Sequence, residues 1–280
     1  MGVLNAKHRV GVYGAALCLL SVASLKADSL CFEFGGYYHS FGTVDLDTGA
    51  ISGTYPPLGN DIGLGVYNGT LYTANTGMLF TVNTAGPSLT QFDDGFGIRL
   101  VDLGSTLSGL YGVGYDQFTY DGSSQSDLGL YSIDPSTGKA TLVGLTGLNY
   151  STSPDIGLST NSDTLYFGDG NELYKIATTT GVYTDVGSFG TGAVPYEMGA
   201  LVVINGVLYG ADINNHTIDT INPFTGAATP GATNNPVIYG LAPDPLPTPG
   251  PETPEPETWS LLAAGVVGLL AKRRCRQRSG

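Results

Sequence analysis

Three acidic residues occupy matching places in this sequence and are its best candidates for binding or catalysis. Asp61 and Asp155 each precede Ile-Gly-Leu, and Glu197 precedes Met-Gly-Ala-Leu. We predict that each apolar segment is the inner strand of a repeated sheet, with its carboxylate at the mouth of a central channel. There the three acids are candidates to hold a cation or a sugar, or to act as paired acids on a glycosidic bond. The alternative is structural, since acids at repeated positions often cap turns and bond the neighbouring repeat.

No other catalytic chemistry is indicated by the residues. The sequence contains no Gly-x-Ser-x-Gly elbow, no HExxH motif and no Walker loop. The histidines between residues 28 and 253 are His39 and His216, which are far apart and lack metal-ligand spacing. Residues 45–49 start like a calcium loop but have no bidentate Glu at the loop's end, which favours a hairpin turn. We therefore expect no metal, no cofactor and no assignable catalytic residue.

A hairpin recurs along the central part of the chain. In its clearest copy, residues 128–144, alternating strands flank a turn with Pro135 early and Gly138 late. Proline fixes φ at the start of such a turn, and glycine supplies the positive φ at its end. Related hairpins lie at residues 41–55, 79–92, 173–187 and 218–231, which brings the count to five.

A second signature, a Leu-Tyr pair after an apolar segment, precedes the later hairpins. The pairs begin at residues 71, 110, 165 and 208, close to the interval of roughly 40–45 residues that marks a four-stranded propeller blade. We therefore predict an all-β fold, a β-propeller of about five four-stranded blades. The hairpin sequence pattern Leu-Tyr-x-Ile-Asp-Pro-x-Thr-Gly also resembles propeller repeats of secreted bacterial proteins. A β-sandwich built from similar hairpins is the alternative fold.

The two ends of the repeat region are expected to pair with each other. The first hairpin lacks an inner strand, while a strand-like segment, residues 237–241, follows the last hairpin. Pairing of the N- and C-terminal strands would close the ring and remove exposed edges. Residues 113–128, rich in Asp, Gly and Ser, are predicted to be a loop inserted into the third blade.

Charge is divided between the middle of the chain and its ends. Residues 28–253 hold three basic residues against 22 acidic ones, a formal charge of 3 − 22 = −19, while the whole chain carries −13. An acidic body is a poor partner for nucleic acid. The cysteines are Cys18, Cys31 and Cys275, of which only Cys31 lies in the body, so an internal disulfide framework is impossible.

The chain divides into four parts. Residues 1–27 have a basic start, an apolar run from 10 to 23 and small residues for cleavage at Ala23 or Ala27, which predicts a secretory signal peptide. An uncleaved N-terminal anchor is the alternative. Residues 28–242 form the propeller-like domain. Residues 243–253 are a proline-rich linker, which favours a stiff extended spacer. Residues 254–280 form a separate tail.

That tail has three parts in a fixed order. The turn Pro254-Glu255-Pro256 comes first, and its prolines keep it extended and exposed. An apolar run, residues 259–271, begins at Trp259 and is predicted to be a membrane helix with an interfacial aromatic anchor. A basic segment, residues 272–278, closes the tail and sets the helix's orientation by the positive-inside rule; it begins Lys272-Arg273-Arg274. The apolar run is short for a full span, which leaves an amphipathic tail helix as the alternative.

This order and its terminal position resemble the PEP-CTERM sorting signal of Gram-negative bacteria. The resemblance rests on Pro254-Glu255-Pro256, the apolar run and the basic end, and it covers residues 254–280. It implies recognition by an exosortase, a membrane protease or transpeptidase, with cleavage near the PEP motif. It further implies transient anchoring by the C-terminus, export across the inner membrane, and a final place in the cell envelope or extracellular matrix. The sequence departs from the pattern where Cys275 and Gln277 interrupt the basic end.

Two functions from different classes follow. The first is a non-enzymatic exported surface or matrix protein that binds or supports exopolysaccharide. The alternative is a secreted carbohydrate-active propeller enzyme that uses the carboxylates at the channel. Convergence of Asp61, Asp155 and Glu197 in an open pocket would favour the enzyme; acids spread around the rim would favour the scaffold.

Overall fold

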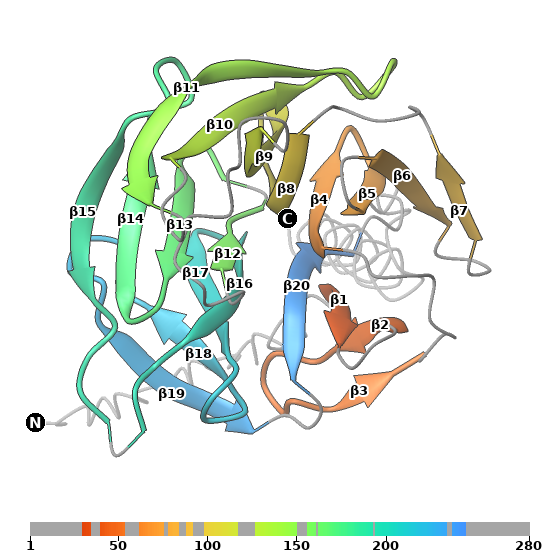
Figure 1. Cartoon of the computed structure of the whole chain (residues 1–280). Coiled ribbons are helices and arrows are strands. Elements are labelled where there is room, and N and C mark those ends of the chain that lie inside the picture. Colours follow the sequence, from red (N-terminus) through yellow and green to blue (C-terminus); the bar gives the residue numbers. More distant parts are fainter. Residues whose placement is uncertain are drawn as a thin grey trace, which may run out of the picture.

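The computed structural model describes residues 30–34, 40–53, 62–75, 78–83, 88–91, 98–116, 127–149, 156–160, 162–192, 194–233 and 237–244. Within these residues all regular structure is β-strand, and no helix occurs. The strands form sheets of four, which follow one another around a common centre like the blades of a propeller (Figure 1). The predicted all-β, propeller-like fold is therefore confirmed.

In each sheet the strands run in order from the centre of the body outward. The first sheet joins both ends of the described chain in the order β20 (Ile238–Pro243), β1 (Leu30–Phe34), β2 (Ser40–Val44) and β3 (Ile51–Ser52). The second sheet contains β4 (Ile62–Tyr67), β5 (Thr70–Asn75), β6 (Met78–Asn83) and β7 (Ser88–Gln91). The third contains β8 (Ile98–Thr106), β9 (Gly109–Asp116), β10 (Asp127–Ile133) and β11 (Ala140–Asn149).

The remaining two sheets repeat this order. The fourth contains β12 (Ile156–Leu158), β13 (Leu165–Asp169), β14 (Glu172–Ile176) and β15 (Tyr183–Ser188). The fifth contains β16 (Met198–Ile204), β17 (Val207–Asp212), β18 (Thr217–Ile221) and β19 (Ala228–Thr233). Within each sheet the strand pairings are antiparallel, which suits strands that are joined by short hairpin turns.

The predicted Thr-Gly hairpins join the third strand to the fourth in four of these sheets. Each turn is closed by a backbone hydrogen bond, for example from Asp134 N to Lys139 O at 2.9 Å, and the same bond recurs at 45–50, 177–182 and 222–227. The glycines of these turns have positive φ, as expected; they are Gly49, Gly138, Gly181 and Gly226. The carboxylate of Asp134 also accepts a hydrogen bond from the amide of Ser136, so this side chain holds the turn.

The two ends of the described chain meet in the first sheet. Leu30 pairs with Pro243, so β1 begins where β20 ends. We call this end of the body the terminal end, and the opposite end, where the inner strands begin, the entry end. Two predicted boundaries change slightly: Pro243 ends β20 instead of opening the linker, and the loop predicted at 113–128 has strand residues of β9 and β10 at its two ends.

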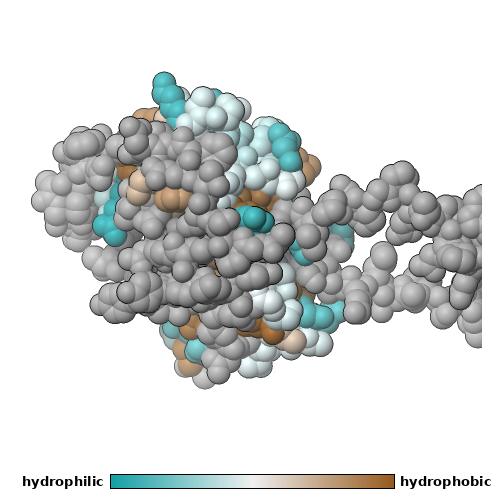
Figure 2. All heavy atoms as spheres, turned by 90° about the vertical axis from the view of Figure 1, so that its right-hand side faces the viewer, coloured by the Kyte–Doolittle hydropathy of each residue, from teal (hydrophilic) through white to brown (hydrophobic). Residues whose placement is uncertain are grey.

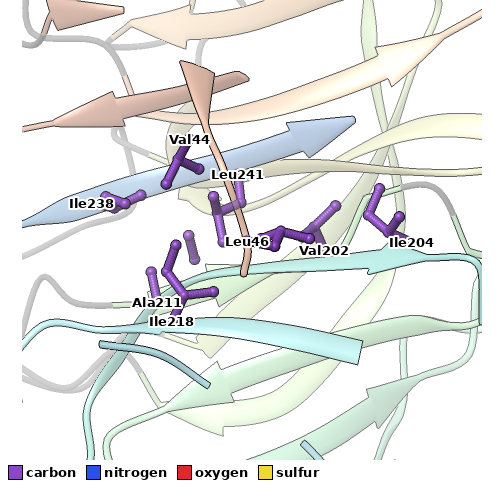
Figure 3. Close-up of a cluster of buried hydrophobic side chains, with 9 residues drawn as sticks. Val44, Leu46, Val202, Ile204, Ala211, Ile218, Ile238 and Leu241 are labelled. Carbon is purple, nitrogen blue, oxygen red and sulfur yellow. The ribbon is translucent and has the colours of Figure 1, made fainter. Parts of the chain in front are cut away.

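Among the described residues, five apolar clusters lie between neighbouring sheets, where a face of one sheet packs against the facing side of the next. One of them joins the first and fifth sheets, with Val44 and Leu241 facing Val202 and Ile218 (Figure 3). The other clusters are centred on Leu64 and Phe41, on Leu103 and Tyr72, on Phe167 and Val113, and on Phe189 and Leu201. The core is thus divided among the sheet-to-sheet contacts, as the repeat predicts.

Glycines let the inner strands approach one another. A Cβ on Gly157 of β12 would lie 3.0 Å from three backbone atoms of Ala200 on β16, and one on Gly104 of β8 would lie 2.5 Å from Ser159 O. Similar contacts join β4 to β8 through Gly63, β16 to β20 through Gly199, and β20 to β4 through Gly240. At Gly63 and Gly104 a Cβ would overlap the backbone of the neighbouring sheet, so these glycines allow the inner strands to lie close together.

The outside of the body mixes polar and apolar residues. Figure 2, which views the right-hand side of Figure 1, shows hydrophobic and hydrophilic residues as small separate areas next to residues of intermediate hydropathy. Among the residues that the structure describes, no helix is long and apolar enough to cross a membrane. The predicted signal peptide, most of the linker and the tail with Pro254, Glu255 and Pro256 lie outside these residues.

Candidate functional site

Of the three predicted acidic positions, the structure describes Glu197, which lies at the entry end. Met198 pairs with Asp212, so the start of β16 and the end of β17 lie together at this end, and Glu197 immediately precedes β16. Asp61 and Asp155 precede β4 and β12 but lie outside the described residues. The structure therefore places only Glu197 of the three.

Glu197 holds a turn in its own sheet. Its Oε2 accepts a hydrogen bond from Asn214 Nδ2 at 3.0 Å, and its backbone oxygen accepts one from Ile213 N at 2.9 Å. Asn214 Nδ2 also donates to Pro195 O at 3.1 Å. The side chain and the backbone oxygen of Glu197 thus both accept hydrogen bonds from the turn between β17 and β18. At this position the geometry fits the structural alternative, an acid that fixes a turn.

Asp212, the last residue of β17, holds the same turn through hydrogen bonds to its side chain. Its side chain is buried, and Oδ1 accepts the backbone amides of Asn214 at 3.0 Å and Asn215 at 3.1 Å. Its Oδ2 accepts Asn215 Nδ2 at 2.7 Å. Asp212 was not among the predicted site residues, although the Asp-x-Asn-Asn sequence is typical of an Asx turn and could have revealed it.

A second buried carboxylate, Asp219, lies one strand further out in the same sheet. Its exposure is 0%, Oδ1 accepts the amide of Gly231 at 3.2 Å, and Oδ2 has no hydrogen-bond partner within the described part of the chain. Burial raises the pKa of Asp219 above the usual value for Asp; the hydrogen bond from the Gly231 amide opposes this rise, and the charge of Asp212 adds a smaller increase. No sequence pattern singles out this acid, because Asp219 sits in the middle of an ordinary strand.

The connection from β15 to β16 is held at both ends by asparagines. Asn171 Nδ2 donates to Ser188 Oγ at 2.6 Å and to Gly190 O at 3.0 Å, while Asn214 binds the far end at Pro195. Phe189, within this connection, is buried in the cluster between the fourth and fifth sheets. The entry end between these two sheets is therefore a fixed polar surface with Asn, Asp and Glu side chains.

The hub, the centre of the body between the inner strands, is bonded together by the segment after β12. The hydroxyl of Thr160 donates to Leu64 O of the second sheet at 2.8 Å, and its carbonyl accepts Val203 N of the fifth sheet at 2.9 Å. Ser159 O accepts Ser105 N of the third sheet at 3.1 Å. Thr160 is fully buried, so protein atoms fill the hub at this level.

Asp102 is a further buried acid of the hub. Asp102 pairs with the residue three positions after the leucine of its Leu-Tyr pair, as Gly157 and Ala200 do in the fourth and fifth sheets. Its Oδ1 accepts Leu103 N at 2.7 Å, and its Oδ2 accepts Leu158 N of the next sheet. The carboxylate therefore joins β8 to β12 by a hydrogen bond. At the equivalent position of the fourth sheet, Gly157 instead lies directly against the backbone of β16.

The described residues contain no cluster of three or more His, Cys, Asp or Glu side chains that could hold a metal ion. Asp102, Asp212 and Asp219 each accept backbone amides, as carboxylates with a structural role do. What the entry end offers chemically is hydrogen bonding from exposed Asn215 and half-buried Glu197, which suits a polar, uncharged ligand.

The chain matches no protein-family model and no curated protein. Among solved structures, a chain of the nidogen/laminin complex superposes with a TM-score of 0.50 at 12% identity, over 76% of this chain and 97% of that one. Regucalcin, a calcium-binding protein of Agrobacterium tumefaciens, gives a TM-score of 0.49 at 16% identity, over 78% and 75%. Glutaminyl cyclase of Myxococcus xanthus gives 0.40 at 20% identity, over 65% and 70%. At such identities the likeness concerns the fold alone.

Proposed function

We propose that this chain is an exported five-bladed propeller that an exosortase-type system sorts through its C-terminal tail. In this proposal the propeller serves as a binding or structural component of the cell envelope or exopolysaccharide and carries out no catalysis. The leader directs export, and the tail inserts in the inner membrane of a Gram-negative cell until the PEP segment is processed. The PEP-CTERM order of Pro254-Glu255-Pro256, the apolar run and the basic end is the observation that carries the sorting proposal.

Closure of the ring is supported by three features of the first sheet. It is composed of strands from both ends of the chain, since β1 pairs with β20. Its inner strand contacts the inner strands of both the second and the fifth sheet. An apolar cluster fills its contact with the fifth sheet as in the other contacts (Figure 3). A ring closed in this way leaves no open inner edge for association with other chains.

The route of the chain supports display from a membrane anchor. Because Leu30 and Pro243 are paired, the leader joins the body and the linker leaves it at the same terminal end. A proline-rich linker extends by about 3.1 Å per residue, so residues 244–256 can span on the order of 40 Å. That length would keep the PEP segment clear of the folded body, and the entry end would face away from the membrane.

The polar character of the entry end supports a binding role over a catalytic one. Glu197 is occupied by Asn214, and the hub below is filled around Thr160. Exposed Asn215, whose side chain is fixed by this turn, can offer hydrogen bonds to sugar hydroxyls without reorganisation. A neutral exopolysaccharide also avoids the repulsion that the acidic body would exert on an anionic polymer.

The sorting proposal is tested by replacing Pro254-Glu255-Pro256 with three alanines in the full chain in its native host. The matched control replaces Pro249-Gly250-Pro251 of the linker, which removes two prolines and leaves the PEP segment intact. We expect the first variant to keep its tail and accumulate in the inner membrane, and the control to be processed and released like the unchanged chain. Identical processing and destination of all three chains would refute the proposal.

A further inference from the structure

One buried acid of the fifth sheet stands where other sheets have an aromatic ring. Asp219 pairs with Gly210, the second residue after the leucine of the Leu-Tyr pair on β17. In the second, third and fourth sheets, the equivalent residues of the third strand are Phe80, Tyr131 and Tyr174. Such a departure from the pattern that the other sheets keep is expected where a residue has a function of its own.

The carboxylate of Asp219 is only partly satisfied by the protein. The side chain has 0% exposure, and its Oδ1 accepts the amide of Gly231 at 3.2 Å. Its Oδ2 is buried and has no hydrogen-bond partner within the described part of the chain. Thr217 Oγ1 is a second buried oxygen of this strand without such a partner. Because buried polar atoms are rarely left unpaired, two such oxygens on one strand indicate a binding site for a water or an ion.

Asp212, Thr217 and Asp219 lie on one face of the fifth sheet. Thr217 pairs directly with Asp212 of β17, and Thr217 and Asp219 are two residues apart on β18. Directly paired side chains have Cβ atoms about 4.5–5.5 Å apart, so these oxygens can reach a shared ligand. Leu208 and Ile221, which pair further along this face, belong to the apolar cluster between the fourth and fifth sheets. The polar group therefore faces the fourth sheet, on the entry side of that cluster.

The charge of this group favours a cation over a water molecule. Asp212 and Asp219 are both buried, and burial of a carboxylate is costly unless the charge is paired or binds a metal. Burial, and to a smaller extent the charge of Asp212, raises the pKa of Asp219, as expected for two acids on one face. The body has three basic residues, none of them in the fifth sheet: Arg99, Lys139 and Lys175.

We propose that Asp219, Thr217 and Asp212 bind a calcium ion between the fourth and fifth sheets. Asp219 Oδ2 and Thr217 Oγ1 supply two ligands, and Asp212 Oδ2, which accepts one hydrogen bond from Asn215, retains a lone pair for a third. All of these ligands are oxygens, which calcium prefers, whereas zinc and copper favour nitrogen or sulfur. Calcium takes six to eight oxygens, so backbone carbonyls or waters complete the shell. With only two carboxylates the site belongs to the weak class, with Kd on the order of 10⁻⁴–10⁻³ M.

Urea unfolding of the full chain tests this proposal at pH 7. The chain is isolated in non-ionic detergent, freed of metal with a chelator and kept in about 0.1 M sodium chloride, which screens weak binding of calcium to the acidic surface. We expect calcium chloride to raise the urea midpoint of the unchanged chain, because a ligand that binds the folded state stabilises it. In Asp219→Asn the calcium affinity obtained from this shift should fall by about tenfold or more.

The matched control is Asp185→Asn, which removes one acid from an exposed position on β15. This control should respond to calcium like the unchanged chain. A second variant, Thr217→Val, keeps both charges and removes one ligand oxygen, so its calcium affinity should lie between those of Asp219→Asn and the unchanged chain. Magnesium at the same concentration should raise the midpoint less than calcium, because it demands near-ideal octahedral geometry and releases its own waters reluctantly.

Three results would overturn this proposal. The first is an unchanged midpoint of the unchanged chain when calcium is added. The second is an equal calcium response of the unchanged chain and Asp219→Asn, which would mean that calcium binds only to the acidic surface. The third is an equal response to magnesium, which would contradict the choice of calcium. None of these measurements depends on processing of the tail, so the calcium site and the sorting proposal can fail independently.

Discussion

The α-carbon of Gly49 lies against the carbonyl oxygen of Thr233, so that a Cβ on residue 49 would be 2.2 Å from that oxygen. Gly49 belongs to the hairpin turn of the first sheet, and Thr233 ends the outer strand of the fifth. The same contact occurs between consecutive sheets, where Gly181 meets Gly144 O and Gly226 meets Gly187 O. The first and fifth sheets therefore meet through the same kind of contact as sheets that follow each other in the chain.

Replacement of this glycine should be costly. Gly49→Ala places a methyl group against the Thr233 carbonyl and also forces a side chain into a backbone with φ of 68°. The φ penalty is about 1–2 kcal/mol, and the overlap should add about 1–3 kcal/mol to the loss of stability. The measurement is the free energy of unfolding in urea. Gly53→Ala is the matched control, because Gly53 has φ of 63° in the same sheet but nothing within 4 Å of the new Cβ. Equal losses for the two variants would show that the contact with the fifth sheet contributes nothing.

A second prediction concerns Thr160 in the hub, whose hydroxyl should contribute to the stability of the fold. Thr160→Val keeps the shape of the side chain but removes the hydroxyl that donates to Leu64 O, which leaves a buried carbonyl without this donor. We expect a loss of about 1–3 kcal/mol in the free energy of unfolding. Thr220→Val, on the exposed side of β18, makes the same chemical change and should alter stability by less than about 0.5 kcal/mol. An unchanged free energy of unfolding in Thr160→Val would contradict the role given to this hydrogen bond.

The sequence predicts the hairpins well because their causes are local. Pro135 and Gly138 act on their own turn, and the alternation around them acts on their own strands. The period of the Leu-Tyr pairs then predicts a propeller-like arrangement, since each repeat must cover the face of the next.

The roles of the hub residues could not be predicted in this way. Gly157 faces Ala200, more than forty positions later, and nothing near Gly157 reveals that contact. Asp102 replaces a small residue of the repeat and binds Leu158 N, which only the assembled sheets bring near. For Glu197 the position at the start of an inner strand was predictable from the repeat, but its partner Asn214 depends on the fold of the turn between β17 and β18.

Asp219 should make stability depend on pH in a direction unusual for a carboxylate. Its pKa is raised by burial, so its contribution to stability is present below the unfolded value near 3.8 and is lost as the pH rises through the folded value. Asp219→Asn removes the buried charge and should raise the urea midpoint at pH 7, with a smaller gain at pH 3.5. A lower midpoint at pH 7 would mean that the carboxylate has a partner that stabilises its charge.

Asp134 should make stability depend on pH in the opposite direction to Asp219. Hydrogen bonds from Ser136 and Thr137 lower the pKa of this exposed carboxyl, so its contribution is present above 3.8 and is lost as the pH falls through the lowered value. Asp134→Asn should therefore lower the urea midpoint at pH 7 and approach the unchanged chain at low pH. The same measurement on both variants compares a buried and a turn-holding carboxylate; shifts of the same sign at pH 7 would contradict this assignment.

Tyr174 predicts a loss of stability in alkali. Burial, followed by the charges of Asp169, Glu172 and Asp185, raises the pKa of Tyr174 from 10.0 to about 12. Its ring packs edge-on against Tyr183 at a centroid distance of 5.2 Å, which holds the phenol in this acidic surrounding. Because the unfolded chain loses the proton first, the contribution of Tyr174 is present below pH 10 and is lost as the pH rises from 10 to 12. Tyr174→Phe has no proton to lose, so its free energy of unfolding should fall less steeply over this interval.

Asp185→Asn separates the contribution of charge from that of burial. Asp185 is exposed on β15 and pairs with Tyr174 across the sheet, so its removal leaves the packing of the ring in place. We expect the tyrosinate absorbance of this variant to develop at lower pH than in the unchanged chain, while Tyr174→Phe lacks the last-titrating component altogether. The measurements are the ultraviolet absorbance of tyrosinate and the urea midpoint of unfolding, both followed between about pH 9 and 12. If Tyr174→Phe shows the same alkaline loss as the unchanged chain, another group causes it, and the clustering of Asp169, Glu172 and Asp185 around Tyr174 has no consequence for stability.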